Sequence, residues 1–414
     1  MGRLLAVIGA AGALLLVRAA CAATDFDWSV DLRAVSSDGT ESRLDGGLGK
    51  LRFDSAHDGL RLGEARAGLR TDLTETMRLN AEAVAYGDHD VNAVDLTEFY
   101  LDWRPIPHSI WRSRFKLGAF YPEISLENRM RGWGSPYTLT YSAINTWVGE
   151  ELRTIGGEYS LDWLGRSNGH GFDVSFNAAA FGWNDPAGTV IATRGWGLTD
   201  RQGTLFGRFA NGGQPYPQRT LFYDDLDKRA GYHAGITANY RGLLELHALH
   251  YDNRADLADA SSVIQDTTWQ TYFDSLGARW TPTAELTLVS QWLHGRTLAG
   301  LGPPVNAWRF DSEFLLASWL QGPMRYSARY DRFASQQTAS NFLANVDNTY
   351  YGDRGHAWTL GAERRFGEHW SATLEGLEVH SWVAQRGIAS EYGGLGIPRN
   401  QRERQWQLAL HYQH

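Results

Sequence analysis

The sequence is poor in cysteine and lysine. Its 414 residues include one cysteine, Cys21, which falls in a predicted export leader. The mature chain therefore has no disulfide and no thiol chemistry. The lysines are Lys50, Lys116 and Lys228, and the formal net charge is −8. An acidic, exported chain is not expected to bind nucleic acid.

The sequence is also poor in motifs of common enzymes. No phosphate-binding glycine loop of the Gly-x-x-x-x-Gly-Lys kind occurs. One Gly-x-Ser-x-Gly match, Gly165 to Gly169, falls in a predicted connection between two strands rather than between a strand and a helix. His247 and His250 are the best metal-like pair, but their odd spacing on a strand points them to opposite faces. We therefore expect no catalytic residue, no metal site and no cofactor. A membrane-barrel lipid hydrolase built from scattered serines and histidines is kept as an alternative.

Residues 1–22 are predicted to be a secretory signal that is removed. Arg3 supplies the positive end, an apolar run follows, and Ala20-Cys21-Ala22 forms a small-x-small cleavage site. The run is too short for a retained membrane helix, and Arg18 interrupts it. Acylation of Cys21 would normally need leucine at the position of Arg18. Removal of Arg3 and Arg18 changes the formal net charge from −8 to −10.

The rest of the chain, 23–414, is predicted to be one all-β domain. Aromatic residues make up 13% and glycines number 45, yet mean hydropathy is −0.39. No later segment is apolar enough for a spanning helix. Apolar and polar residues alternate repeatedly, as in Phe172 to Ala180 and Trp406 to Tyr412. These features are typical of a transmembrane antiparallel β-barrel; a secreted soluble β-protein is the alternative.

Turn chemistry and loop length set the number of strands. The alternating segments predict about 16 strands, at 25–36, 59–71, 76–87, 93–104, 110–121, 150–162, 170–183, 229–241, 243–253, 268–281, 284–296, 306–320, 323–333, 356–366, 369–382 and 401–413. Each short turn then follows an even strand and each long loop an odd one, with the short turns periplasmic. Trp103, Tyr240, Trp280, Phe366 and Trp370 flank these turns, as an interfacial aromatic girdle would.

Two assignments in this scheme are less determined. Segment 41–54 is placed in the first outer loop, although it could replace 25–36 as the first strand. Segment 184–229 becomes the fourth outer loop, with a short hairpin near 204–209 outside the wall. Segment 121–149 becomes the third outer loop and shows neither strand alternation nor a clear helix.

At the start of that third loop the chain looks familiar. The runs Phe120-Tyr121-Pro122-Glu123-Ile124-Ser125-Leu126-Glu127-Asn128 and Tyr326-Ser327-Ala328-Arg329-Tyr330-Asp331 resemble outer-membrane porins of the phosphate-selective O/P type. The resemblance implies a sixteen-stranded channel in the bacterial outer membrane, a homotrimer, and anionic solutes. It extends as a pattern over most of the mature chain.

The polar faces of the strands are expected to line water. Their basic candidates are Arg66, Arg70, Arg78, Arg112, Arg114, Lys116, Arg279, Arg325 and Arg329. A column of arginine forks would lower the cost of anion passage. The alternative is a solvated wall balanced by acids, namely Glu64, Glu82, Glu98, Asp102, Asp173, Glu245, Asp311, Glu313, Glu375 and Glu403.

The third loop is expected to fold into the lumen and set the constriction, because a barrel of this size is otherwise wide. Its charged candidates are Glu123, Glu127, Arg129 and Arg131. They would either create a transverse field at the constriction or pin the loop to the wall as ion pairs. The sequence thus predicts a passive porin for small hydrophilic solutes, in contact with outer-membrane lipid. A barrel enzyme and a non-conducting structural barrel are the alternatives.

Overall fold

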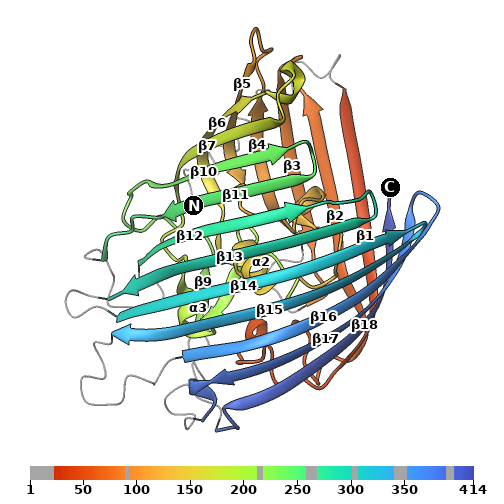
Figure 1. The fold of residues 1–414 in the computed structure, drawn as a ribbon. Coiled ribbons are helices and arrows are strands. Elements are labelled where there is room, and N and C mark those ends of the chain that lie inside the picture. The colour runs from red at the N-terminus through yellow and green to blue at the C-terminus, as the bar shows by residue number, and fades with distance from the viewer. Residues whose placement is uncertain are drawn as a thin grey trace.

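The structure is a computed structural model that describes residues 23–88, 94–211, 218–257, 268–300, 306–339, 352–387 and 396–414. The predicted signal, 1–22, lies outside the described residues. Sixteen antiparallel strands close into one barrel (Figure 1). They are β1 (Thr24–Ser37), β2 (Gly59–Asp72), β3 (Met77–Ala85), β4 (Asp95–Trp103), β5 (Trp111–Phe120), β6 (Thr154–Trp163), β7 (Phe172–Gly182), β10 (Gly231–Tyr240), β11 (Leu244–Asp252), β12 (Trp269–Trp280), β13 (Leu286–Ala299), β14 (Asn306–Gln321), β15 (Met324–Ala339), β16 (Gly352–Phe366), β17 (Trp370–Val383) and β18 (Asn400–Gln413).

The predicted number of strands and the alternation of short turns with long loops are confirmed. Each strand pairs with its neighbour in the chain, and β1 pairs with β18 to close the ring. Closure leaves no strand edge, as a membrane barrel requires. Segment 41–54 lies in the first outer loop, where it holds the short 3-10 helix η1 (Arg43–Asp45) rather than a strand.

The outward face carries the apolar belt that a lipid-facing barrel needs. Near the short turns, Trp103, Tyr240, Trp280, Phe366 and Trp370 are all exposed, which confirms the predicted aromatic girdle. Leucines such as Leu360, Leu374, Leu408 and Leu410 are exposed beyond them. No helix in the described ranges is both long and apolar enough to cross a membrane.

Three outer loops, as far as the structure describes them, fold inward into the outer half of the barrel. We call them L1 (38–58), L3 (121–153) and L4 (183–230). L3 contains helix α2 (Ala143–Glu151), every residue of which is buried, and L4 contains helix α3 (Thr189–Thr193). Figure 1 shows both helices within the ring of strands. Their apolar side chains form one core with the inner face of β11 to β17. The third loop therefore lies in the lumen, as predicted.

Three local expectations need correction. The third loop does contain a helix, because α2 is buried on all sides and so lacks the amphipathic period by which helices are recognised. The L4 hairpin lies outside the barrel sheet as expected, but at β8 (Arg208–Asn211) and β9 (Gln218–Leu221). On β14, Phe310 and Phe314 point inward, so Asp311 and Glu313 are on the outer face rather than the lumen wall.

Candidate functional site

L3 is fastened to the barrel wall at four points. Its four predicted charged residues pair with four different strands: Glu123 with β5, Glu127 with β15, Arg129 with β11 and Arg131 with β1. In the ring of sixteen, β5 and β15 are eight strands apart in either direction, and so are β1 and β11. The loop is thus held along two crossed diameters of the barrel, so it spans the lumen rather than lying against one wall.

The β5 attachment is partly accessible to water. Glu123 accepts from Lys116 Nζ at 2.6 Å and from Arg114 at 3.3 Å. The attraction of Lys116 holds the pKa of Glu123 at about 2, so this carboxylate is ionised at all physiological pH values. Lys116 also contacts Glu158 of β6 at 3.1 Å. Lys116 is mostly buried by these partners, whereas Arg112 below it is half exposed and pairs with Asp162.

The β15 attachment is completely buried. Arg329 has zero exposed side-chain area and donates to Glu127 and Asp331, both at 2.7 Å. It also donates to the carbonyl oxygens of Thr140 and Tyr141 of L3. Arg329 points inward as the alternation predicts, but the expectation that it lines water is wrong. L3 covers the Arg329 side chain, and this side chain in turn holds L3 in place.

The remaining attachments lie across the other diameter. Arg129 forms a two-pronged pair with Glu245 of β11, and Arg131 pairs with Asp25 and Asp27 of β1. After Arg131, Gly132 has φ +61°, and a Cβ there would lie 2.5 Å from the Arg66 guanidinium. Only glycine fits this close approach to the wall without strain.

The other predicted wall residues occupy the inner face with acidic partners. Arg66 pairs with Glu64 at 2.8 Å and is mostly buried, and Arg70 pairs with Glu82 at 3.2 Å. Arg78, near the periplasmic mouth, pairs with Asp72 and is half exposed. Arg325 lies 3.6 Å from Glu363, and Arg279 lies opposite Glu245 in the ladder. Four of these five arginines therefore pair with an acid nearby.

Helix α2 joins L3 to the apolar wall and to L4. Trp147 makes edge-to-face contacts with Trp196 of L4, Phe273 of β12 and Phe310 of β14. Glu151 accepts from Trp147 Nε1 at 2.5 Å and from the Val190 amide of α3 at 2.8 Å. Burial raises the pKa of Glu151 to about 7. The two loops thus share one dry junction.

Two buried acids that the sequence interpretation did not single out connect the remaining loops. Asp353 of β16 accepts from Lys50 of L1 and from the Trp196 amide of L4, both at 2.7 Å. Asp200 of L4 accepts from Arg33 of β1 and Arg52 of L1. The inward parity of Arg33 and Asp353 was readable from the strand pattern, but their loop partners were not.

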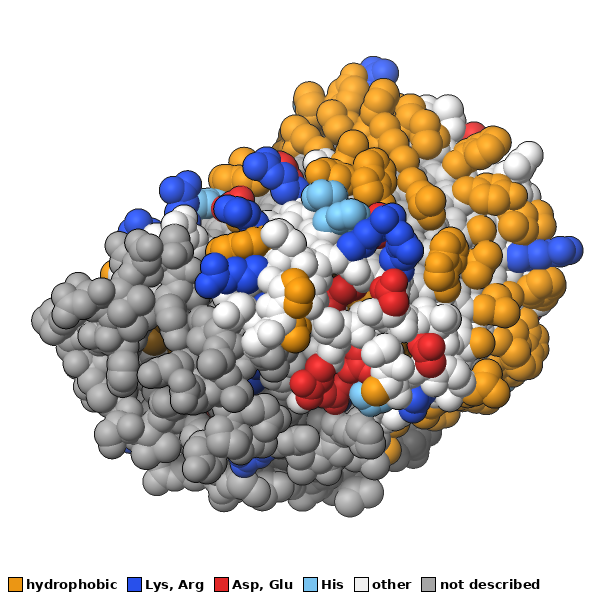
Figure 2. All heavy atoms as spheres, turned by 90° about the horizontal axis from the view of Figure 1, so that it is seen from below, with side chains coloured by type: hydrophobic (Ala, Val, Ile, Leu, Met, Phe, Trp, Pro, Cys, Tyr) orange, Lys and Arg blue, Asp and Glu red, His pale blue; other side chains and the backbone are white. Residues whose placement is uncertain are grey.

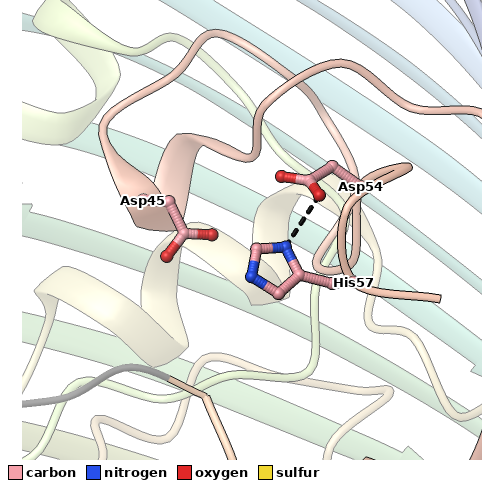
Figure 3. A group of neighbouring side chains, drawn as sticks. All are labelled: Asp45, Asp54 and His57. Atoms are coloured by element: carbon pink, nitrogen blue, oxygen red, sulfur yellow. Dashed lines mark hydrogen bonds and ion pairs between the residues drawn. The ribbon is translucent and has the colours of Figure 1, made fainter. Parts of the chain in front are cut away.

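Two groups of acids in the loops cluster closely enough to draw attention. In L1, Asp45, Asp54 and His57 turn toward one another (Figure 3). Asp54 already accepts from His57 at 2.7 Å and from the backbone amides of Ser42 and Ala56. In L4, Asp185 of the group with Asp225 and Asp227 likewise accepts from two amides of its own loop. Both groups serve to shape their loops.

Comparison with known proteins yields structural neighbours only. No family model and no curated protein matches the sequence. The outer membrane channel DcaP of Acinetobacter baumannii has a TM-score of 0.56 with 11% identity, over 96% of this chain and 98% of that chain. An anion-selective porin of Comamonas acidovorans has a TM-score of 0.50 with 13% identity, over 95% and 100%. OmpT, an outer membrane protein of Vibrio cholerae, has a TM-score of 0.52 with 8% identity, over 96% and 99%.

This chain has the porin fold. At these identities the likeness concerns the fold alone, and the belt of exposed aromatic and leucine side chains gives the fold its setting. A closed antiparallel barrel with such a belt is a protein of the bacterial outer membrane.

Proposed function

We propose that the chain is a passive diffusion channel for small hydrophilic solutes, with L3 forming its constriction. The observation that carries this proposal is water-accessible charge inside the barrel. The side chains of Arg112 on the wall, Glu123 on L3 and Arg131 on L3 are 50%, 47% and 45% exposed. If the loops closed the barrel completely, these charged side chains would be buried against partners rather than exposed to water, because burying a charge is costly.

The proposal includes a bias toward anions or carboxylates. Arg112, Arg114 and Lys116 project inward from alternate positions of β5, ending beside L3. Glu123 of the loop pairs directly with Lys116 and Arg114 at the end of this column, so positive and negative groups lie side by side at the edge of the passage. Such an arrangement favours polar solutes over apolar ones and offers guanidinium forks to carboxylate or phosphate. The resemblance to phosphate-selective O/P-type porins is in keeping with this bias.

We further propose a homotrimer that assembles through the side of the barrel formed by β2 and β3. Their outward residues include a cluster of alanines: Ala65 pairs with Ala85 and Ala67 with Ala83 across the ladder. A flat surface of alanines allows two barrels to approach closely, as small residues do between membrane helices. Native mass spectrometry of the detergent-solubilised protein tests the stoichiometry, and Ala67→Trp is expected to yield monomers.

A planar-bilayer recording tests the channel. The purified protein should give stepwise conductance, and Arg112→Gln with Arg114→Gln should shift the reversal potential in a salt gradient toward cations. Lys116 is left in place because its loss would strand Glu158. Arg364→Gln, which removes an outward-facing arginine, is the control and should change nothing.

The same preparation separates the rival functions. A barrel without conductance steps would be structural, and release of fatty acid from added phospholipid would identify a lipid hydrolase. Steps whose reversal potential ignores Arg112 and Arg114 would keep the channel and remove the anion bias.

A further inference from the structure

The outer surface of the long strands carries a row of basic and histidine side chains. In the ladder, Arg332 of β15 pairs with His356 of β16, His356 with His380 of β17, and His380 with Arg402 of β18. All four point outward, because their neighbours Phe333, Ala357, Val379 and Glu403 are buried on the inner face. The row spans three strand spacings, about 14 Å.

This row lines a groove of about 680 Å³ on the barrel exterior. Its charged walls are Arg332, Arg354 and Arg402, joined by His356 and His380, and no described carboxylate is among the lining residues. Trp382 and Tyr330 supply apolar surface. The His356 and His380 rings stack with centroids 5.1 Å apart, so the floor is a preformed flat surface.

The cations exceed their acidic partners. Glu378 alone serves Arg402, Arg404 and His380, at 2.5, 3.1 and 2.8 Å. Arg332 has Glu313 at 3.3 Å, and both side chains are at least half exposed. Arg354 lies 4.6 Å from the Trp382 ring centroid, and no described carboxylate pairs with it. The groove thus offers guanidinium donors that the described residues do not satisfy.

The position of the groove along the strands shows which part of the membrane surrounds it. On β16 the outward residues run from Phe366 through Leu360 and Trp358 to His356 and Arg354. Trp358 is exposed and ends the apolar belt, so the first basic residues lie about 7 Å further along the strand. On β18 the same change occurs between Trp406 and Arg404. Figure 2 shows Lys, Arg and His side chains gathered beside the hydrophobic belt.

We propose that this groove binds the phosphate-bearing headgroup of a lipid of the outer leaflet. The headgroup layer begins where the apolar belt ends, and arginines grip phosphate oxygens with paired, charge-assisted hydrogen bonds. Trp382 and Tyr330 suit the sugar or glycerol that carries the phosphate, since such rings are amphipathic contact surfaces at a membrane interface. The site is outside the channel and independent of conduction.

Native mass spectrometry with three probes tests the proposal: diphosphorylated lipid A, its enzymatically dephosphorylated form, and inorganic phosphate. The unaltered protein should retain the diphosphorylated lipid through gas-phase release from neutral detergent, and the dephosphorylated form should bind at least about tenfold more weakly. Equal binding of both lipids would overturn the proposal without any variant. Displacement of the lipid by an equimolar amount of inorganic phosphate would also overturn it, by assigning the groove to the free anion.

Arg354→Gln with Arg402→Gln should weaken binding of the diphosphorylated lipid by about tenfold. The matched control is Arg364→Gln with Arg241→Gln, two arginines near the periplasmic turns that also lie over aromatic rings. An equal loss in the control would show that total charge, not the groove, determines retention, and the proposal would fail. Both variants are compared at equal heat-modifiable gel mobility, which reports a folded barrel.

Discussion

The inner face of the barrel is polar along β5 and largely apolar along the outer half of β14. On β5 the inward residues include Arg114 and Lys116, while Phe115 and Leu117 face outward and are exposed. On the outer half of β14 the inward residues include Phe310 and Phe314, while Glu313 faces outward. Both strands alternate between polar and apolar residues, but the charged residues face inward on β5 and outward on the outer half of β14. What a strand face carries depends on what it meets: water and the charged start of L3 inside β5, but apolar, packed loops inside β14.

Strand length explains the reversal. β3 and β4 have 9 residues each, which is about what a tilted strand needs to cross the membrane. β14 and β15 have 16 residues each and extend beyond the belt. Their extra residues face headgroups and water on the outside, and L3 and L4 on the inside. A lumen with a polar wall on one side and packed loops on the other follows from this difference.

The largest expected effect comes from the buried attachment on the packed side. Arg329→Gln would leave Glu127 and Asp331 buried without their cation, which costs about 3–5 kcal/mol. We expect L3 to detach from β15, with a lower midpoint of urea unfolding and a higher, noisier single-channel conductance. Arg325→Gln on the same strand is the control, because its side chain is less buried and Glu363 is 3.6 Å away. Equal effects of the two variants would mean that Arg329 has no special role.

The apolar part of the same side should come next. Trp147→Ala would remove the edge-to-face contacts with Trp196, Phe273 and Phe310, and core Trp→Ala changes cost about 3–5 kcal/mol before local collapse. We expect a lower unfolding midpoint and faster protease cleavage in L4. Trp292→Ala on the outward face of β13 is the control. A Trp147 variant as stable as this control would show that α2 does not anchor the loops.

The barrel itself was predictable because its signals are local. Alternation, short turns and flanking aromatics each occupy a few consecutive residues. The strict odd–even order of loops then excludes a seventeenth strand at 41–54, but it does not decide whether 25–36 or 41–54 is the first strand. Which face of each strand points into the lumen was harder to predict. Asp311 and Glu313 alternate like a lumen wall, and only knowledge of which loops fill the lumen shows that they face outward.

The sequence predicted the charged residues of the site, but it did not predict the residues with which they pair. Glu123, Glu127, Arg129 and Arg131 were recognisable as a charged set within one loop. Their partners on β5, β15, β11 and β1 are far apart in sequence, and sequence spacing carries no information about such pairs. The roles of Lys50 and Asp200 depended on two further loops entering the lumen, for which no local pattern exists.

A smaller, pH-dependent effect is expected at the junction of L3 and L4. Burial raises the pKa of Glu151 from 4.5 to about 7, so the folded barrel holds this proton more tightly than the unfolded chain does. The free energy of unfolding should therefore fall as pH rises from about 4.5 to about 7, and this contribution should be lost above pH 7. Glu151→Gln, which is always neutral, should remove about 1–3 kcal/mol of the difference between pH 5 and pH 8. Urea midpoints of both proteins at both pH values provide the measurement. The same pH slope in the variant would locate the effect in other groups.

The smallest expected effect on stability concerns the attachment on the β1 side. Arg131 and Asp25 are about half exposed, and exposed ion pairs contribute about 0–1 kcal/mol. Arg131→Gln should therefore leave the urea midpoint almost unchanged, unlike Arg329→Gln. Conduction should respond differently, because Arg131 ends one of the two diameters along which L3 is held. With that end free, the loop should fluctuate more in the passage, which would appear as increased noise in the open-channel current. Arg364→Gln on the outward face serves as the control for charge. Unchanged noise would mean that the buried attachment at Arg329 alone fixes the loop, and the crossed arrangement would then be a matter of geometry without mechanical consequence.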